Sequence, residues 1–269
     1  MSCVVLTSAS GAPGVTTTAL GLCLQWPGEC VLVDADRSLS HPVLAGYLRG
    51  QAPEVLGLQG LLQAHREGSA LGEAYRANRV ALPPAPVRGA AVAPPRWFLP
   101  GCAFLPSVDQ LERLWPAWLA ELNTMPEDVI IDAGRLGHRG LPPTLLAANT
   151  VGLVCRTSLV SLAGLRVNLP PLVEAAPPGR VGLVLVGPGR PYVAKEIAAQ
   201  FGVPVLAELP WEPRQAGDLA DGQVLAPNWA RQGLARGFAE MAHGLRTQFA
   251  PVVPAAASAN PISAAVCDD

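Results

Sequence analysis

The chain reads Ser8-Ala9-Ser10-Gly11-Ala12-Pro13-Gly14-Val15-Thr16-Thr17-Thr18 directly after a short apolar run, Cys3 to Leu6. The apolar run predicts a buried strand, and the residues after the glycines predict a helix. Glycines let backbone N–H groups turn toward a bound anion, and the start of a helix adds partial positive charge. The first prediction is therefore a phosphate-binding loop between a strand and a helix.

This loop lacks the basic residue that phosphate loops usually carry. The usual pattern ends in Gly-Lys-Ser/Thr, where the lysine reaches the β- and γ-phosphates and the hydroxyl reaches Mg²⁺. Gly14 and Thr16 occupy the expected positions, but Val15 stands at the lysine position. Lys195 is the only lysine in the whole chain. Whether phosphate is bound and whether it is turned over are therefore separate questions.

Composition indicates one large α/β domain in a reducing compartment. Of the 269 residues, 50% are hydrophobic and 15% charged, and the net charge of −2 gives no general reason to expect nucleic-acid binding. The cysteines show no Cys-x-x-Cys spacing and are expected to be small buried apolar residues. Because no basic leader and no apolar run of about 20 residues is present, we expect a cytoplasmic protein, at most peripheral to a membrane.

Strand and helix patterns alternate along the chain, which predicts a doubly wound, mostly parallel sheet with helices on both faces. We expect one domain over 1–250 and a disordered Ala/Pro-rich tail over 251–269. Ser107 and Gln110 form a capping-box pattern that predicts a helix start, and Pro116 should kink or split that helix. Buried strands are expected at Cys30–Val33, Val129–Asp132, Val151–Cys155, Val181–Val186 and Val203–Leu209, and later helices at Leu159–Leu172, Tyr192–Phe201 and Trp229–Phe249.

Three carboxylates follow predicted strands. Asp34 and Asp36 come after the second strand, and Asp132 comes at the end of a later one. Because the carboxyl ends of parallel strands share one edge, these residues and the glycine loop should converge. Backbone donors, a hydroxyl and carboxylates form the set that a phosphate–Mg²⁺ site needs, with one carboxylate free to orient water. Each aspartate taken singly could instead be a helix cap.

These segments resemble the ParA/MinD family of deviant P-loop ATPases, whose loop reads Lys-Gly-Gly-x-Gly-Lys-Thr-Thr. Here the loop appears as Ser10-Gly11-Ala12-Pro13-Gly14-Val15-Thr16-Thr17, the second motif as Val33-Asp34-Ala35-Asp36, and the Walker B strand as Asp128-Val129-Ile130-Ile131-Asp132-Ala133-Gly134. Leu209-Pro210-Trp211-Glu212-Pro213-Arg214 is similar to the late segment that lies near the base. The resemblance implies a P-loop NTPase fold of the SIMIBI type and covers residues 1–250 in element order.

The resemblance also assigns roles. Asp36 and Asp132 would be the catalytic residues, with Thr16 and Asp132 holding Mg²⁺. ATP or ADP would bind through the loop and its neighbours, namely Gly11, Ala12, Pro13, Gly14, Val15, Thr16, Thr17, Asp34 and Arg135.

The departures from the family pattern weaken the expectation of catalysis. The signature lysine that crosses an ATP-sandwich dimer would be Ser10, and the loop lysine would be Val15. The asparagine that often reads adenine is replaced by Val186-Gly187-Pro188-Gly189. Lysine-poor versions of this kind are similar to actinobacterial proteins found near pilus-type secretion ATPases. The resemblance thus implies a nucleotide-binding regulatory or positioning protein with weak or no hydrolysis, serving a pilus, secretion or partitioning machine.

Two further possibilities stay open at this point. Arg37 or Arg135 could replace the missing lysines and give an active ATPase, although each could equally be solvated or paired with a neighbouring aspartate. The last helix could lie on a membrane surface, but its few basic residues favour packing on the sheet. A protein partner, such as a secretion or pilus ATPase, and a homodimer are both expected. The histidines, including His41, show no ligand spacing, and surface or capping roles are expected for them.

Overall fold

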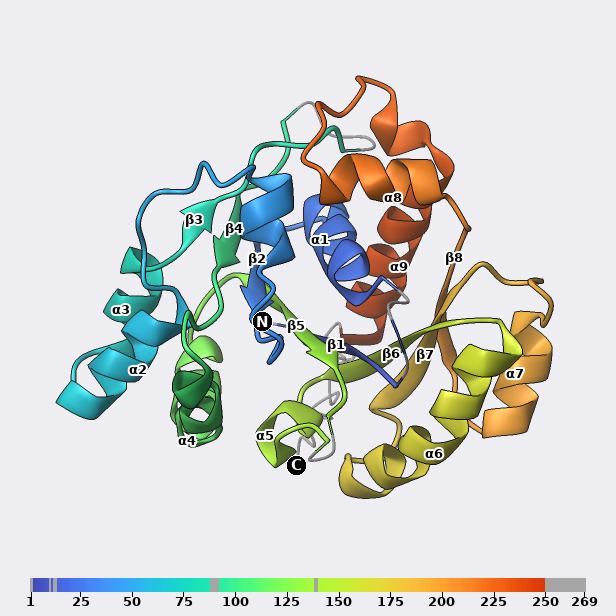
Figure 1. Cartoon of the computed structure of the whole chain (residues 1–269), viewed down its shortest axis with the longest axis horizontal. Helices are drawn as coiled ribbons and strands as arrows, with labels where there is room; N and C mark the ends of the chain where they lie inside the picture. The colour runs from blue at the N-terminus through green and yellow to red at the C-terminus, as the bar shows by residue number, and fades with distance from the viewer. Residues whose placement is uncertain (1, 10, 12–13, 88–91, 138–139, 250–269) are drawn as a thin grey trace, which may run out of the picture.

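The computed structural model describes residues 2–9, 11, 14–87, 92–137 and 140–249. Ser10, Ala12 and Pro13 of the loop, and the tail expected over 251–269, lie outside the described residues. The described chain forms one eight-stranded sheet in the order β3-β4-β2-β5-β1-β6-β7-β8, with helices on both of its faces (Figure 1). All neighbouring strands are parallel except β3 and β4. The predicted fold class is confirmed.

The strands are β1 (Cys3–Ser8), β2 (Cys30–Asp34), β3 (Val80–Ala81), β4 (Arg96–Leu99), β5 (Asp128–Arg135), β6 (Thr150–Arg156), β7 (Val181–Val186) and β8 (Val205–Leu209). The helices are α1 (Val15–Gln25), η1 (Val43–Tyr47), α2 (Leu58–Glu67), α3 (Leu71–Ala77), α4 (Leu105–Leu122), α5 (Pro143–Leu146), α6 (Leu159–Ala175), α7 (Ala194–Phe201), α8 (Pro213–Ala220), η2 (Trp229–Arg231) and α9 (Gly233–Phe249).

Two hydrophobic layers hold the sheet, one on each face. Along β1, Val5 belongs to the layer beneath α2–α6, whereas Val4 and Leu6 belong to the layer beneath α1, α8 and α9. The alternation follows from the two-residue repeat of a strand, and it makes each central strand apolar on both sides. This explains why β1, β2, β5 and β6 read as nearly continuous apolar runs.

Local signals misplaced two helix features. The expected start at Ser107 is wrong, because α4 begins at Leu105 with Phe104 as its N-cap and Ser107 buried within the helix. Pro106 lies in the first turn, where its missing N–H costs no intrahelical hydrogen bond. Pro116 does not split α4, which runs through to Leu122.

The other expected segments hold with shifted ends. The expected last helix over 229–249 is divided into η2 and α9, and Gln232 separates them in an extended conformation. β4 pairs with β3, a two-residue strand that the sequence analysis did not identify. Cys3, Cys23, Cys30, Cys102 and Cys155 are buried free thiols, as expected. Among the described residues, no helix is long and apolar enough to cross a membrane.

The helix after the loop is packed tightly against the last helix. A β-carbon placed on Gly21 of α1 would overlap the ring of Phe238, which is fully buried on α9. Glycine at this position therefore allows the two helices to approach closely. The approach keeps α1, and with it the loop at its start, against the sheet.

Substitution of this glycine should destabilise the fold. We expect Gly21→Ala to lower the free energy of unfolding by about 1–3 kcal/mol, because the methyl group must displace a buried ring. The loss should appear despite alanine's higher helix propensity of about 1 kcal/mol. Urea denaturation followed by circular dichroism measures the difference.

The matched control is Gly244→Ala on α9, where a β-carbon would meet no atom within 4 Å. This variant should be neutral or up to about 1 kcal/mol more stable. Equal stability of Gly21→Ala and the parent chain would contradict the close packing of α1 against α9.

Candidate functional site

Three carboxylates and the loop meet at one edge of the sheet. Asp34 of β2 pairs in register with Asp132 of β5, and Asp132 pairs in turn with Leu6 of β1. Asp36 follows β2, and its carboxylate lies so close to Gly134 that a β-carbon there would overlap it. Asp132 lies within β5 and not at its end, because β5 continues to Arg135. The structure thus brings together the residues that the sequence predicted would converge.

The described part of the loop is shaped for an anion. Gly14 is the N-cap of α1 and has φ 97° and ψ 38°, in the left-handed region that glycine adopts without strain. Its carbonyl accepts a hydrogen bond from the Thr18 N–H at 2.8 Å, and among the described residues no side chain caps α1. The first backbone N–H groups of α1 therefore remain available to a bound phosphate.

The position that a lysine would occupy belongs to the hydrophobic core. Val15 is only 7% exposed and packs in the layer formed by α1, α8 and α9. A valine here stabilises the helix against the sheet and brings no charge to the start of α1. Val15 is therefore a core residue of this chain.

Asp132 is the most perturbed carboxyl group of the site. It is buried, and burial raises its pKa to about 7, partly offset by a hydrogen bond from the Thr16 side chain. The Gly134 N–H also donates to Oδ1 at 2.9 Å. The negative charges of Asp34 and Asp36 raise the pKa further. Thr16 and Asp132, the two predicted Mg²⁺ ligands, are thus in direct contact.

Asp36 is held by the residues that follow it. The Ser38 N–H donates to Asp36 Oδ1 at 2.9 Å, and the Ser38 hydroxyl donates to Oδ2 at 2.9 Å. The Ser38 hydroxyl also lies 3.1 Å from that of Ser40. A carboxylate fixed in this way can accept a hydrogen bond from water, the role predicted for Asp36.

His41 is a residue of the site that sequence reasoning missed. Its Nδ1 lies 2.9 Å from Asp34 Oδ2, and this hydrogen bond raises the pKa of the imidazole above its ordinary value. His41 has φ 45°, as Leu39 has φ 54°, so this short loop folds back over Asp34 with two non-glycine residues in the left-handed region. A β-carbon on Gly101 would lie 3.0–3.2 Å from Asp34 and His41. The contact between His41 and Asp34 depends on this strained loop, and residue spacing in the sequence does not predict it.

The two candidate arginines differ in position. The Arg37 guanidinium is paired with Glu112 at 3.0 Å and with Asp109 at 3.7 Å, both on α4. Arg135 lies beside the loop, where its Nη2 is 3.6 Å from the place that a β-carbon on Gly11 would take. Arg135 is thus placed to contact a ligand in the loop, whereas Arg37 is engaged with α4.

A pocket of about 300 Å³ opens on the other side of the loop. It is lined by Gly14 and Thr17 from the loop side and by Trp211 from the segment after β8. The Arg156 guanidinium lies 4.6 Å from the centre of the Trp211 ring, and the Arg190 guanidinium lies 5.7 Å from it. Trp211 belongs to the segment Leu209–Arg214 that the sequence resemblance related to the base. Arg156 was not singled out from the sequence, although it ends β6, the strand next to β1.

The donor set fits Mg²⁺ held together with phosphate better than a metal held by protein alone. Within the described residues, no group of three or more His, Cys, Asp or Glu side chains could hold a metal ion. Mg²⁺ commonly binds through one or two protein oxygens plus substrate phosphates and water. Thr16 and Asp132 beside the loop match that requirement.

The raised pKa of Asp132 predicts a pH dependence of stability. In the folded protein this carboxyl keeps its proton up to about pH 7, whereas in the unfolded chain it releases the proton near pH 4. The free energy of unfolding of the parent therefore falls through this group between about pH 4 and 7. The side chain at position 132 of the Asp132→Asn variant cannot ionise. The free energy of unfolding of this variant minus that of the parent should therefore increase by about 1–4 kcal/mol from pH 5 to pH 8, as measured by urea denaturation.

The exposed acid Glu54 supplies the control for this measurement. Glu54→Gln should follow the parent at both pH values. A stability difference between Asp132→Asn and the parent that stays constant from pH 5 to 8 would show that Asp132 titrates normally.

Comparisons with known proteins address the fold. No protein-family model and no curated protein matches the chain. Among solved structures, the chain is similar to a ParA family ATPase from Chlorobium tepidum (TM-score 0.66, 16% identity, 90% of this chain and 98% of that one). It is also similar to the MinC:MinD cell division protein complex from Aquifex aeolicus (0.65, 13%, 92% and 96%). A third similar structure is Pyrococcus horikoshii MinD complexed with Mg-ADP (0.58, 17%, 90% and 94%). The chain therefore has the fold of the MinD and ParA-family ATPases.

Proposed function

We propose that the chain is a ParA/MinD-like regulatory or positioning protein with a degenerate phosphate loop, which binds ATP or ADP with Mg²⁺ weakly and hydrolyses little or no ATP. The observation that carries the proposal is the contact of Thr16 with Asp132 beside Gly14, next to a lysine position filled by the buried Val15. The chain retains the parts that bind phosphate and metal. At position 15 it carries a valine in place of the lysine that would supply positive charge.

Electrostatics supports weak binding. Asp34, Asp36 and Asp132 converge on the site, while Arg135 is the cation beside Gly11. An anionic nucleotide would meet net negative charge, so binding should depend on Mg²⁺, which when bound supplies positive charge between phosphate and carboxylates. A lost hydrogen bond to a charged group weakens binding by about 1.5–3 kcal/mol, or roughly ten- to a hundredfold.

Hydrolysis should suffer more than binding. Positive charge supplied to the transferring phosphoryl group accelerates related reactions by about 10³–10⁵-fold. With Val15 in the core and position 10 occupied by serine, neither of the family's lysines is present. A nucleotide that binds here would therefore act mainly as a bound signal.

The pocket beside the loop is suited to the base. Its wall combines the Trp211 ring with apolar side chains such as Leu209 and Phe238, and an aromatic face stacks well on a flat heterocycle. Gly14 and Thr17 connect this pocket to the phosphate loop. Among the described residues that line this pocket, Arg156 is the basic one.

The solved neighbours support the proposal in general terms. Pyrococcus horikoshii MinD is complexed with Mg-ADP, and Aquifex aeolicus MinD is complexed with the protein MinC. By analogy we propose a protein partner for this chain in the cytoplasm, in the form of a pilus, secretion or partitioning machine.

The second candidate function is an active ATPase that uses an arginine in place of the lysines. The position of Arg135 beside Gly11 favours it. Arg37, the other sequence candidate, is paired with Glu112 and Asp109 and would have to leave those partners to reach a phosphate. In this alternative Arg135 contacts the γ-phosphate and Asp36 orients the water.

Calorimetry with MgATP tests the loop. We expect detectable, weak binding to the parent chain, loss of binding in Thr16→Ala, and retention in Thr16→Ser, which keeps the hydroxyl. Val15→Lys should bind about ten- to a hundredfold more tightly. The same variant should unfold more easily by about 1–3 kcal/mol, because a core valine is lost.

Measurements on the parent and on Val15→Lys together test whether the loop binds MgATP. If neither binds MgATP although Val15→Lys is folded by circular dichroism, the proposed nucleotide site is wrong. Equal binding by the Thr16→Ala and Thr16→Ser variants would remove the proposed role of the hydroxyl.

Comparison of two arginine variants tests the alternative function. Arg135→Ala should weaken binding of MgATP by about tenfold and that of MgADP by less, because the lost contact is to the γ-phosphate. Arg37→Ala should leave both affinities unchanged. A phosphate-release assay on the parent, with Arg135→Ala as the blank, reports turnover. If the two variants have identical affinities for ATP, Arg135 does not reach the phosphate.

A further inference from the structure

The outer face of α6 is apolar where a surface helix normally is polar. Leu159, Val160, Val167 and Val173 are 67%, 82%, 74% and 43% exposed. The buried side of the same helix is apolar too, with Leu165 and its neighbours in the layer beneath. A helix that is apolar all round is usually covered on both sides.

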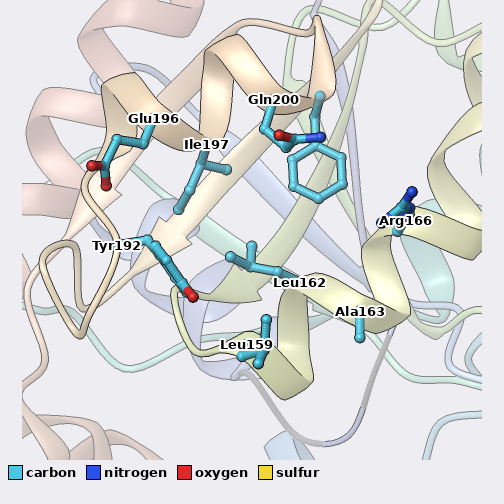
Figure 2. A pocket seen from close by; sticks show the side chains of 9 residues that line it. Leu159, Leu162, Ala163, Arg166, Tyr192, Glu196, Ile197 and Gln200 are labelled. Carbon is cyan, nitrogen blue, oxygen red and sulfur yellow. The ribbon is translucent and has the colours of Figure 1, made fainter.

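A groove runs beside this face, between α6 and α7 (Figure 2). One part, about 490 Å³ in volume, is lined by Leu159, Leu162 and Tyr192 among others. The next part, about 460 Å³, is lined by Pro170 and Val173 among others. The two parts share Arg166, Gln200 and Phe201, so they form one continuous depression along α6.

The pattern of side chains on this face is self-complementary. Arg166 and Glu174 are the charged residues of α6, and both lie four residues from Pro170. Val167 and Val173 both lie three residues from it. At 100° per residue, all of these positions fall within an arc of about 120° on the exposed side. Within the described residues, neither Arg166 nor Glu174 makes an ion pair.

We propose that this face is an interface between two copies of the chain, with α6 packed antiparallel to α6 of the second copy about a two-fold axis at Pro170. In that arrangement Arg166 lies level with Glu174 of the other copy, and Val167 lies level with Val173 of the other copy. A two-fold interface uses the same patch twice, so both ion pairs form together. An unrelated partner would not require charges placed symmetrically about one residue.

The proposed contact is independent of the nucleotide site. Its axis at Pro170 lies toward the end of α6 that precedes the start of β7, whereas the phosphate loop follows the carboxyl end of β1. α6 is 17 residues long, about 25 Å. A seam of this length makes a small interface, so we expect a weak dimer with a dissociation constant in the micromolar range, on the order of 10 µM.

Charge reversal in the full-length chain without nucleotide tests the pairing. Sedimentation velocity over a range of concentrations should show reversible dimerisation of the parent. Arg166→Glu and Glu174→Arg should each weaken it by about tenfold or more, because two attractive pairs become repulsive. The double variant should recover the affinity of the parent. An equimolar mixture of the two single variants should also recover it, because the pairs are opposite again in the mixed dimer.

Arg113→Glu on the exposed side of α4 is the matched control and should dimerise like the parent. A parent that stays monomeric at all concentrations overturns the proposal, and the face then belongs to another protein or to another segment. Single variants that dimerise like the parent, or a mixture that shows no recovery, overturn it as well.

A thiol at the axis gives a second, geometric readout. In a Cys267→Ser background, Pro170→Cys should form a covalent dimer when diamide oxidises its thiol, because residue 170 of each copy meets the other at the axis. Ala163→Cys, seven residues along the same exposed face, should not form one. Cross-linking of both variants to the same extent, or of neither, would contradict an axis at Pro170.

Discussion

The parallel pairing of β1 between β5 and β6 is the constraint on which the rest of the site depends. Each of these strands is apolar on both faces, so each must be covered by helices above and below. Helical crossovers then bring the carboxyl ends of the strands to one edge. The register pairing of Leu6 with Asp132, and of Asp132 with Asp34, is a direct consequence. The carboxylates converge because the core is buried, before any ligand is considered.

The same burial separates the backbone geometry at the start of α1 from the side chain at position 15. A lysine at position 15 would keep its charge at the phosphate, whereas Val15 packs in the core layer. The left-handed Gly14 and the tight contact of Gly21 with Phe238 still hold the start of α1 in place. The geometry at Gly14 therefore depends on the backbone and on helix packing, and it does not depend on a charged side chain at position 15.

Much of the fold and part of the site could be predicted from sequence, for a physical reason. Buried parallel strands are short apolar runs that end in turn or polar residues, so β2, β5, β6 and β7 were recognisable, and Asp34 and Asp132 with them. The start of α4 was not, because Ser107 offers a capping pattern that the first-turn Pro106 overrides. The contact of Arg37 with Glu112 joins a loop to an element 75 residues away, and the contact of His41 with Asp34 needs the loop after β2 to fold back through two left-handed residues. Such contacts depend on tertiary packing, which no local pattern encodes.

The site buries an ionisable group, whereas the outer face of α6 exposes apolar side chains. At the site, Asp132 is buried with a raised pKa beside two further carboxylates, and this charge is relieved only by a proton or a cation. At α6, apolar surface is exposed to water and is relieved only by another surface. The proposed pairing of α6 with α6 of a second copy would cover Val167 and Val173 without any change at Asp132.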